Sequence, residues 1–268
     1  MGWQSLLRLK SDLATEDSLV PKRRRILVLV PLITKEREAA SIRKFLQTYA
    51  WDGTTIDVAG LERNPAVNSN SEATMAAVDF VRRVQQAEKD GYDAVISYCY
   101  ADVGVDAARQ MANIPVIGPL EASVLTGILL GRKLSIVSVG ALYPPGEFYI
   151  LPRLKENDLD SCCASVRGIS FDEFFVFSDD SSKTERTKEA LLSECKKALG
   201  EDGAHVLILA CTGFPMAREL RGVLGVPVID AAITLKIAEA LVDLGLSHSK
   251  VLTYKKQRTR NVVDWEAV

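Results

Sequence analysis

The sequence contains few of the residues that metal sites and disulfide frameworks require. It has two histidines, His205 and His248, and neither lies at a metal-ligand spacing from a cysteine or a carboxylate, which argues against a zinc site. The five cysteines have no periodic spacing. They fit a reducing compartment better than a set of disulfide bonds, and we therefore expect a cytoplasmic protein.

Long apolar runs, strong net charge and cofactor motifs are also missing. No apolar run approaches the length needed to cross a bilayer, and the N-terminus lacks the features of a secretory signal. A formal net charge of −2 argues against a nucleic acid or a membrane as the main partner. Because there is no phosphate-binding loop, dinucleotide fingerprint or recognisable Schiff-base lysine, we predict no cofactor and a small-molecule substrate.

An internal repeat is the most informative feature that the sequence does contain. Residues 92–118 and 204–230 each hold an apolar run that ends at a cysteine, Cys99 or Cys211. A turn and a short helical stretch follow, and Pro-Val-Ile begins sixteen positions after each cysteine, with Arg109 and Arg221 in register. Such a repeat indicates two copies of one supersecondary unit, with one thiol at the same structural point of each.

Alternating strand and helix patterns indicate an α/β fold. Strands are expected at 26–31, 54–61, 94–98, 115–117, 133–139, 162–169 and 206–210, and helices at 35–49, 71–89, 104–111, 120–130, 148–156, 183–199 and 232–244. This order predicts two pseudo-symmetric lobes, each a mainly parallel sheet flanked by helices. Ligands bind beyond the carboxyl ends of parallel strands, so the active site is expected in the cleft between the lobes.

The repeat also suggests how the chain is divided. Residues 1–25 are expected to form an N-terminal extension that ends in a basic run. We predict a first lobe from residues 26–122 together with 230–268, which add a last helix and a tail. The second lobe is then formed by residues 123–229. We also expect the chain to form a homo-oligomer.

The repeat distinguishes two of the five cysteines as candidate catalytic residues. An unpaired cysteine is usually a small buried hydrophobe, and we assign that role to Cys162, Cys163 and Cys195, which have no symmetry. Cys99 and Cys211 stand at equivalent points of the ligand-binding edge. Two thiols that face each other across a cleft are what an enzyme needs to exchange a proton without a cofactor.

These stretches resemble the Asp/Glu/hydantoin racemase superfamily, and most of all its hydantoin racemase branch. The similar stretches are 99–104 (CYADVG), 114–118 (IPVIG), 121–122 (EA), 135–138 (SIVS), 164–169 (ASVRGI), 211–213 (CTG) and 225–230 (GVPVID). The resemblance implies two pseudo-symmetric lobes with the site between them, and it implies that Cys99 and Cys211 are the two bases of racemisation. No metal or pyridoxal phosphate takes part in that chemistry.

The predicted local environment suits this role. Each cysteine is expected to end a strand and precede a helix, whose N-terminus would lower the thiol pKa. The backbone N–H groups of residues 100–102 and 212–214 would then stabilise the enolate oxygen. The residues that we expect to contact substrate are Thr34, Tyr100, Ala101, Asp102, Ser138, Thr212, Gly213 and Phe214. For Asp102, a role in capping a helix is an equally good interpretation.

One stretch departs from the family pattern. After its first strand the family commonly has Pro-Asn-Thr-Ser, and here Pro31 is followed by Leu32, Ile33 and Thr34. We therefore expect a more apolar pocket floor. The insertion-like stretch 140–149 is expected to reshape the pocket further.

Three functions remain open at this point. The leading hypothesis is a racemase or epimerase acting on an acidic C–H next to a carbonyl, as in a hydantoin, a ureide or an amino acid. A maleate-isomerase-like cis–trans isomerase with a cysteine nucleophile is the first alternative. The second is a non-catalytic protein that binds a small acid in the two-lobed cleft. The presence of both cysteines argues against the superfamily's decarboxylases, which resemble it but typically use the second thiol alone.

Overall fold

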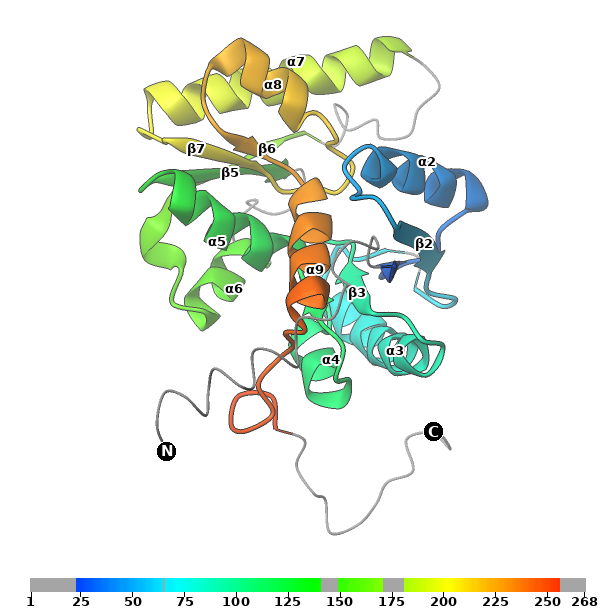
Figure 1. Cartoon of the computed structure of the whole chain (residues 1–268). Coiled ribbons are helices and arrows are strands. Elements are labelled where there is room, and N and C mark those ends of the chain that lie inside the picture. The colour runs from blue at the N-terminus through cyan, green and yellow to red at the C-terminus, as the bar shows by residue number, and fades with distance from the viewer. Residues whose placement is uncertain (1–22, 65, 141–148, 171–180, 256–268) are drawn as a thin grey trace, which may run out of the picture.

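Two four-stranded parallel sheets form the centre of the protein (Figure 1). The computed structural model describes residues 23–64, 66–140, 149–170 and 181–255. The first sheet has the order β2 (Thr54–Gly60), β1 (Arg24–Val30), β3 (Ala94–Ser97), β4 (Val116–Ile117). The second has the order β6 (Cys163–Ile169), β5 (Leu134–Val139), β7 (Val206–Leu209), β8 (Val228–Ile229). The identical strand order confirms the predicted two-lobed α/β fold.

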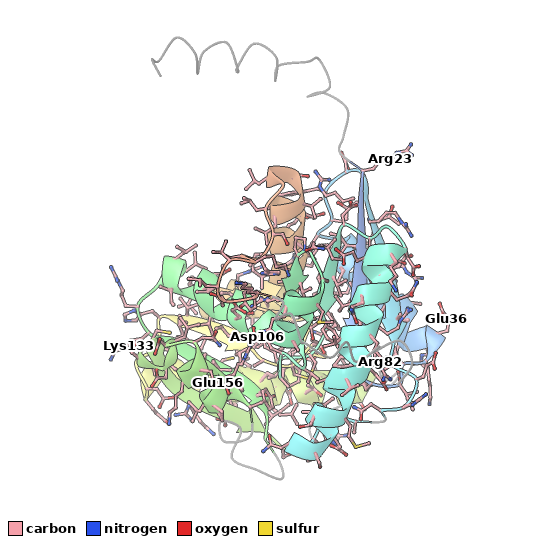
Figure 2. The ribbon with its side chains drawn as sticks, turned by 90° about the horizontal axis from the view of Figure 1, so that it is seen from below. Arg23, Glu36, Arg82, Asp106, Lys133 and Glu156 are labelled. Carbon is pink, nitrogen blue, oxygen red and sulfur yellow. The ribbon has the colours of Figure 1, made fainter. Side chains whose placement is uncertain are left out.

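Helices flank both sheets. They are α2 (Glu36–Gln47), α3 (Asn70–Lys89), α4 (Val105–Met111), α5 (Pro119–Leu130), α6 (Ile150–Glu156), α7 (Ser181–Gly200), α8 (Ala217–Leu224) and α9 (Ala232–Leu244), with a 3-10 turn at Asp160–Cys162. Helix α9 lies between the two lobes (Figure 1). Seen from below, Lys133 of the second lobe and Glu36 of the first lie at opposite sides of the molecule (Figure 2).

The alternation of side chains along the strands builds three cores. On β1, Ile26 and Val28 face a central core that also contains Ile136 of β5, whereas Leu27 and Leu29 face α3 and α4. A third core lies between the second sheet and helices α7 and α8. Successive residues of a buried strand point to opposite faces of the sheet, so an unbroken apolar run is what a strand covered on both sides requires. Because the central core contains residues of both β1 and β5, it joins the two lobes.

Of the element boundaries that differ from those expected, two change the interpretation of individual residues. β1 begins at Arg24, which is 6% exposed and forms a two-pronged ion pair with Asp243 at 2.6 Å, so this arginine belongs to the strand and not to the extension predicted for residues 1–25. Helix α3 is capped by Ser69, whose Oγ accepts the Glu72 N–H at 3.2 Å, and not by Ser71 as the sequence suggested. Residues 1–22 and 256–268 lie outside the described residues.

Candidate functional site

The two cysteines occupy matching turns at the carboxyl ends of β3 and β7. The residue before each is still bonded to the central strand of its sheet: Tyr98 N–H donates to Leu29 O at 2.9 Å, and Ala210 N–H donates to Val137 O at 2.7 Å. Both thiol-bearing residues are partly exposed. The structure therefore places both cysteines at the edge that the parallel strands predict for a ligand site.

The turn after each cysteine closes in the same way. The N–H of Asp102 donates to Cys99 O at 3.0 Å, and the N–H of Phe214 donates to Cys211 O at 2.9 Å. Our expectation that these two N–H groups stabilise an enolate is wrong, because the turns already use them. Hydrogen bonds from the backbone N–H groups of Ala101 and Gly213 instead lower the pKa values of Cys99 and Cys211, respectively, and so favour the two thiolates.

Burial, and not a helix N-terminus, dominates the acidity of the two thiols. It raises the pKa of Cys99 to about 11 and that of Cys211 to about 12. The expected lowering is wrong because α4 begins at Val105 and α8 at Ala217, six residues after each cysteine, and a helix dipole acts only near its first turn. Cys99 also raises the pKa of Cys211, so the two thiols are close enough to interact.

Asp102 takes the capping role. Its carboxylate accepts the N–H groups of Leu120 and Glu121, both at 3.1 Å, at the start of α5. The side chain is 4% exposed, and burial raises its pKa to about 7. Asp102 also raises the pKa of Cys99, so its carboxylate lies near that thiol although its oxygens bond to α5.

Two further predicted residues have side chains inside the cores. Tyr100 is 2% exposed, and its hydroxyl lies 3.1 Å from the hydroxyl of Ser123. Phe214 is completely buried in the core of the second lobe. Both aromatic rings are buried in the cores, and the contacts that we expect them to make with substrate stay a prediction.

Ser138 and Tyr149 form a hydroxyl chain beside the second cysteine. The Ser138 hydroxyl donates to Ala210 O at 2.9 Å, directly before Cys211, and the Tyr149 hydroxyl lies 2.9 Å from Ser138 Oγ. Burial raises the pKa of Tyr149, and Cys99 and Cys211 raise it further, so this phenol lies near both thiols. The sequence analysis did not single out Tyr149, although it ends the stretch 140–149 that was expected to reshape the pocket; residues 141–148 lie outside the described residues.

The loop after β1 packs tightly against β2. Thr34 Oγ1 donates to Leu32 O at 3.1 Å, so this predicted substrate-binding hydroxyl is bonded within its own loop. A Cβ on Gly60 would lie 2.7 Å from Leu32 O and from Thr34 Cβ, which leaves room only for glycine. The Leu32 side chain packs against the central core, and Thr212 is partly exposed.

Metal-binding and membrane-spanning features are not found in the described part of the chain. No group of three or more histidine, cysteine, aspartate or glutamate side chains there is placed to hold a metal ion. His248 Nε2 accepts the Val116 N–H at 2.8 Å and is thus engaged in packing the C-terminal segment. None of the described helices has the length and apolar character needed to cross a membrane.

Comparison with known proteins gives one consistent result. A family model described as Asp/Glu/Hydantoin racemase matches residues 28–235. Hydantoin racemase of Paenarthrobacter aurescens is 30% identical over 87% of this chain and 97% of its own length. Hydantoin racemase of Pseudomonas sp. (strain NS671) is 31% identical over 74% of this chain and 78% of its own. The crystal structure of allantoin racemase from Pseudomonas fluorescens superposes with a TM-score of 0.78, at 31% identity, over 89% of this chain and 99% of that one.

Proposed function

The chain belongs to the Asp/Glu/hydantoin racemase family, and we propose that it is a cofactor-independent racemase or epimerase in which Cys99 and Cys211 are the two acid/base groups. The observation that carries this proposal is the pair of matching turns, in which Cys99 and Cys211 follow the carboxyl ends of the equivalent strands β3 and β7 of the two lobes. One acid/base on each face of a carbon is what inversion of that carbon requires.

The reaction is a balanced exchange of two protons. The thiolate of one cysteine removes the proton on its face of the carbon, and the C–H electron pair moves into the adjacent carbonyl to form an enolate. The thiol of the other cysteine then protonates the opposite face and becomes the thiolate. Release of a proton from the first cysteine to solvent, and uptake of a proton from solvent by the second, return the starting state.

The raised pKa values suit a weakly acidic carbon. Fewer thiolates are present at neutral pH, but each is a stronger base once formed. The effect of Cys99 on the pKa of Cys211 disfavours two thiolates at once, and the mechanism needs one thiolate facing one thiol. The N–H groups of Ala101 and Gly213 stabilise whichever thiolate is present.

Several polar groups near the thiols are proposed to orient the substrate. We assign this role to the hydroxyls of Tyr149 and Ser138, supported by the position of Tyr149 near both thiols. The hydroxyl of Thr212 and the backbone at residues 100–101 and 213 keep the role that the sequence predicted for them. Asp102 and Thr34 act through the turn and the loop that they hold.

The substrate class follows from the chemistry and from the names of the relatives. Two relatives are named hydantoin racemases, and the superposed structure is an allantoin racemase. Hydantoins and ureides both carry a C–H beside a carbonyl, with N–H groups alongside. We therefore propose a cyclic ureide or a hydantoin with an apolar substituent as the substrate.

A deuterium-exchange screen in D₂O tests this function. Hydantoins, ureides and α-amino acids are incubated with the protein, and both deuterium at the α-carbon and loss of optical rotation are followed. The proposal expects both signals for at least one cyclic ureide. Cis–trans conversion of maleate without C–H exchange would favour the isomerase alternative, and binding with no exchange in any class would favour a non-catalytic protein.

A further inference from the structure

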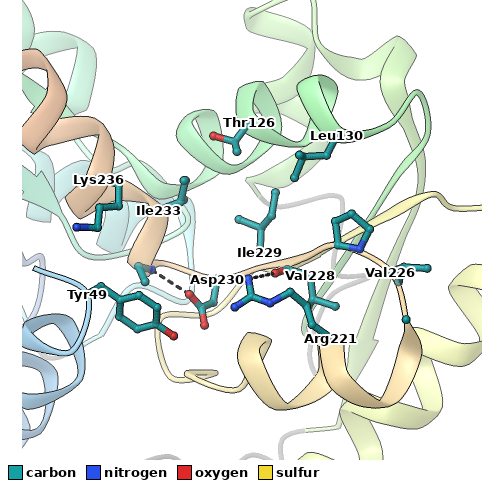
Figure 3. Close-up of a pocket in the computed structure, with 13 residues that line it drawn as sticks. Tyr49, Thr126, Leu130, Arg221, Val226, Val228, Ile229, Asp230, Ile233 and Lys236 are labelled. Atoms are coloured by element: carbon teal, nitrogen blue, oxygen red, sulfur yellow. Dashed lines mark hydrogen bonds between the residues drawn. The ribbon is translucent and has the colours of Figure 1, made fainter.

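A concave site whose lining includes neither cysteine lies where both lobes meet α9. It is a groove of about 640 Å³ formed by α5, α8, β8, α9 and the end of α2 (Figure 3). Arg221 lines it beside Val228, and Tyr49 and Lys236 lie at the other end. This volume is within the range of small-molecule sites, which is about 300–1,000 Å³. No step of the proposed racemisation uses this groove.

The internal repeat shows what the first lobe has at the equivalent place. Arg109 and Arg221 occupy matching positions and bond to matching edge-strand carbonyls: Arg109 Nε donates to Val116 O at 3.0 Å, and Arg221 Nη1 donates to Val228 O at 3.1 Å. The β4 edge of the first lobe and the β8 edge of the second can therefore be compared residue by residue.

In the first lobe, other parts of the protein bond to the arginine and to the strand edge. Arg109 Nη1 pairs with the Glu121 carboxylate at 2.7 Å and with the Tyr254 hydroxyl at 3.0 Å. The Val116 N–H donates to His248 Nε2 at 2.8 Å. A carboxylate, an aromatic ring and a hydrogen-bond acceptor thus cover the arginine and the strand edge.

In the second lobe, the sequence replaces these groups. Ile233 stands where the first lobe has Glu121, so the carboxylate partner is missing from the equivalent helix. Within the described residues, the guanidinium of Arg221 has one hydrogen bond, to Val228 O. The N–H and C=O of one strand residue point the same way, so the Val228 N–H faces the groove as its carbonyl does.

One acidic side chain lies in the groove, and backbone groups hold it. The Asp230 carboxylate accepts the N–H groups of Ala217 at 3.3 Å and Ala232 at 3.1 Å (Figure 3 shows the second bond). Burial raises the Asp230 pKa, and the nearby charges of Arg218 and Arg221 oppose that shift. Two arginines therefore lie near one carboxylate, and both oxygens of that carboxylate already accept backbone N–H groups.

We propose that this groove is a second binding site, for an organic carboxylate that has an apolar body. The carboxylate would take the place that Glu121 has in the first lobe, bonded to the Arg221 guanidinium and close to the Val228 N–H. The apolar body would lie against Leu130, which is 53% exposed, and against Ile233. Burial of such apolar surface together with one charge-assisted pair is the usual composition of a small-ligand site.

Phenylacetate is a suitable probe, and phenylacetamide is its uncharged isostere. Binding to the full chain is measured by ligand-observed NMR and calorimetry, so the readout does not depend on racemase activity. We expect phenylacetate to bind and phenylacetamide to bind at least about tenfold more weakly, because a hydrogen bond to a charged group contributes roughly 1.5–3 kcal/mol.

The repeat supplies matched variants. Ile233→Glu places the carboxylate of the first lobe beside Arg221 and should abolish phenylacetate binding, whereas the uncharged Ile233→Gln should retain it. Arg221→Gln should weaken binding about tenfold, whereas Arg82→Gln on α3 should not. A Cys99→Ala, Cys211→Ala double variant should bind phenylacetate as the unmodified protein does. Thermal unfolding confirms that each variant is folded.

Three results would overturn the proposal. They are no phenylacetate binding to the unmodified protein, equal binding of the amide, and binding that survives both Ile233→Glu and Arg221→Gln. Loss of binding in the double cysteine variant would place the carboxylate in the cysteine cleft and would also overturn it.

Discussion

The carboxylate of Asp102 fills the space that a side chain on Gly118 would need. A Cβ on Gly118 would lie 2.5 Å from Asp102 Cγ, well inside the closest approach of real carbon atoms. This contact holds the turn after Cys99 against the start of α5. In the second lobe the aspartate is at the other position. Asp230 stands at the position equivalent to Gly118, and its carboxylate bonds to the first turn of α9.

Gly118→Ala should therefore destabilise the protein. The backbone at Gly118 has a φ of −96°, which alanine adopts freely, so the cost is the displacement of Asp102. We expect a loss of about 1–3 kcal/mol in the free energy of unfolding, measured by urea denaturation. Gly222→Ala in α8 is the matched control: a Cβ there meets nothing within 4 Å, and the change should stabilise the helix by about 0.5–1 kcal/mol. Equal stabilities of the two variants would contradict this account.

Cys99→Ala and Cys211→Ala should each abolish racemisation, because the proposed mechanism has one acid/base on each face of the carbon. A single variant can still exchange the α-proton of one enantiomer through the remaining thiol. Chiral chromatography and deuterium incorporation, followed separately for each enantiomer, measure the two effects. Cys195→Ala, at a fully buried position in the second lobe, controls for loss of folding. Conversion of both enantiomers at near unmodified rates by either catalytic variant would end the two-cysteine mechanism.

The rate of α-proton exchange should rise with pH across the neutral range. Burial raises the two thiol pKa values to about 11 and about 12, so between pH 7 and 9 the thiol form predominates. The thiolate fraction then grows about tenfold for each pH unit, and the exchange rate should follow it. The double cysteine variant supplies the background of uncatalysed exchange to be subtracted. A rate that levels off below pH 8 would mean that the thiols are more acidic than their burial implies.

Activity should be independent of metal ions and organic cofactors. Proton transfer between two thiols needs neither, and no set of side chains in the described part of the chain is arranged as a metal site. Prolonged dialysis against EDTA should leave the exchange rate unchanged, with dialysis against buffer alone as the control. Loss of activity that a divalent cation restores would contradict the mechanism.

The features that the sequence predicts well are those recorded in the order of its residues. The apolar runs of β1 and β5 identify buried strands because a parallel sheet covered on both faces needs apolar residues on both. The spacing between Cys99 and Cys211 equals that between Arg109 and Arg221, and the two arginines do bond to equivalent carbonyls. The internal repeat and the periodicity of apolar residues were sufficient to predict the fold class.

The parts that could not be predicted depend on distances across the fold. Nothing in the order of residues shows that the Asp102 N–H is used by its own turn, or that its carboxylate reaches α5. Burial of the thiols depends on the packing of the folded chain, so the direction of their pKa shifts was wrong in the sequence analysis. Tyr149 was missed for the same reason, because its bond to Ser138 joins two residues that are 11 positions apart in the sequence.

The last prediction concerns the loop after β1, where Leu32 stands in place of the asparagine common in the family. Leu32 packs against the central core, and its carbonyl accepts from the Leu61 N–H at 3.0 Å and from Thr34 Oγ1, so the loop is held and its side chain can be exchanged without unfolding it. A buried polar group of a substrate that meets leucine instead of an amide loses roughly 1–3 kcal/mol, or about one to two orders of magnitude in affinity.

We therefore expect weak turnover of unsubstituted hydantoin and better turnover of hydantoins or ureides that carry an apolar group. Leu32→Asn should shift this selectivity towards the unsubstituted ring, and Leu32→Met, which keeps the apolar character, should not. The ratio of kcat/KM for the two substrates measures the shift, and urea denaturation checks that each variant is folded. If the unmodified protein turns over unsubstituted hydantoin efficiently and Leu32→Asn leaves the ratio unchanged, this loop does not line the substrate site.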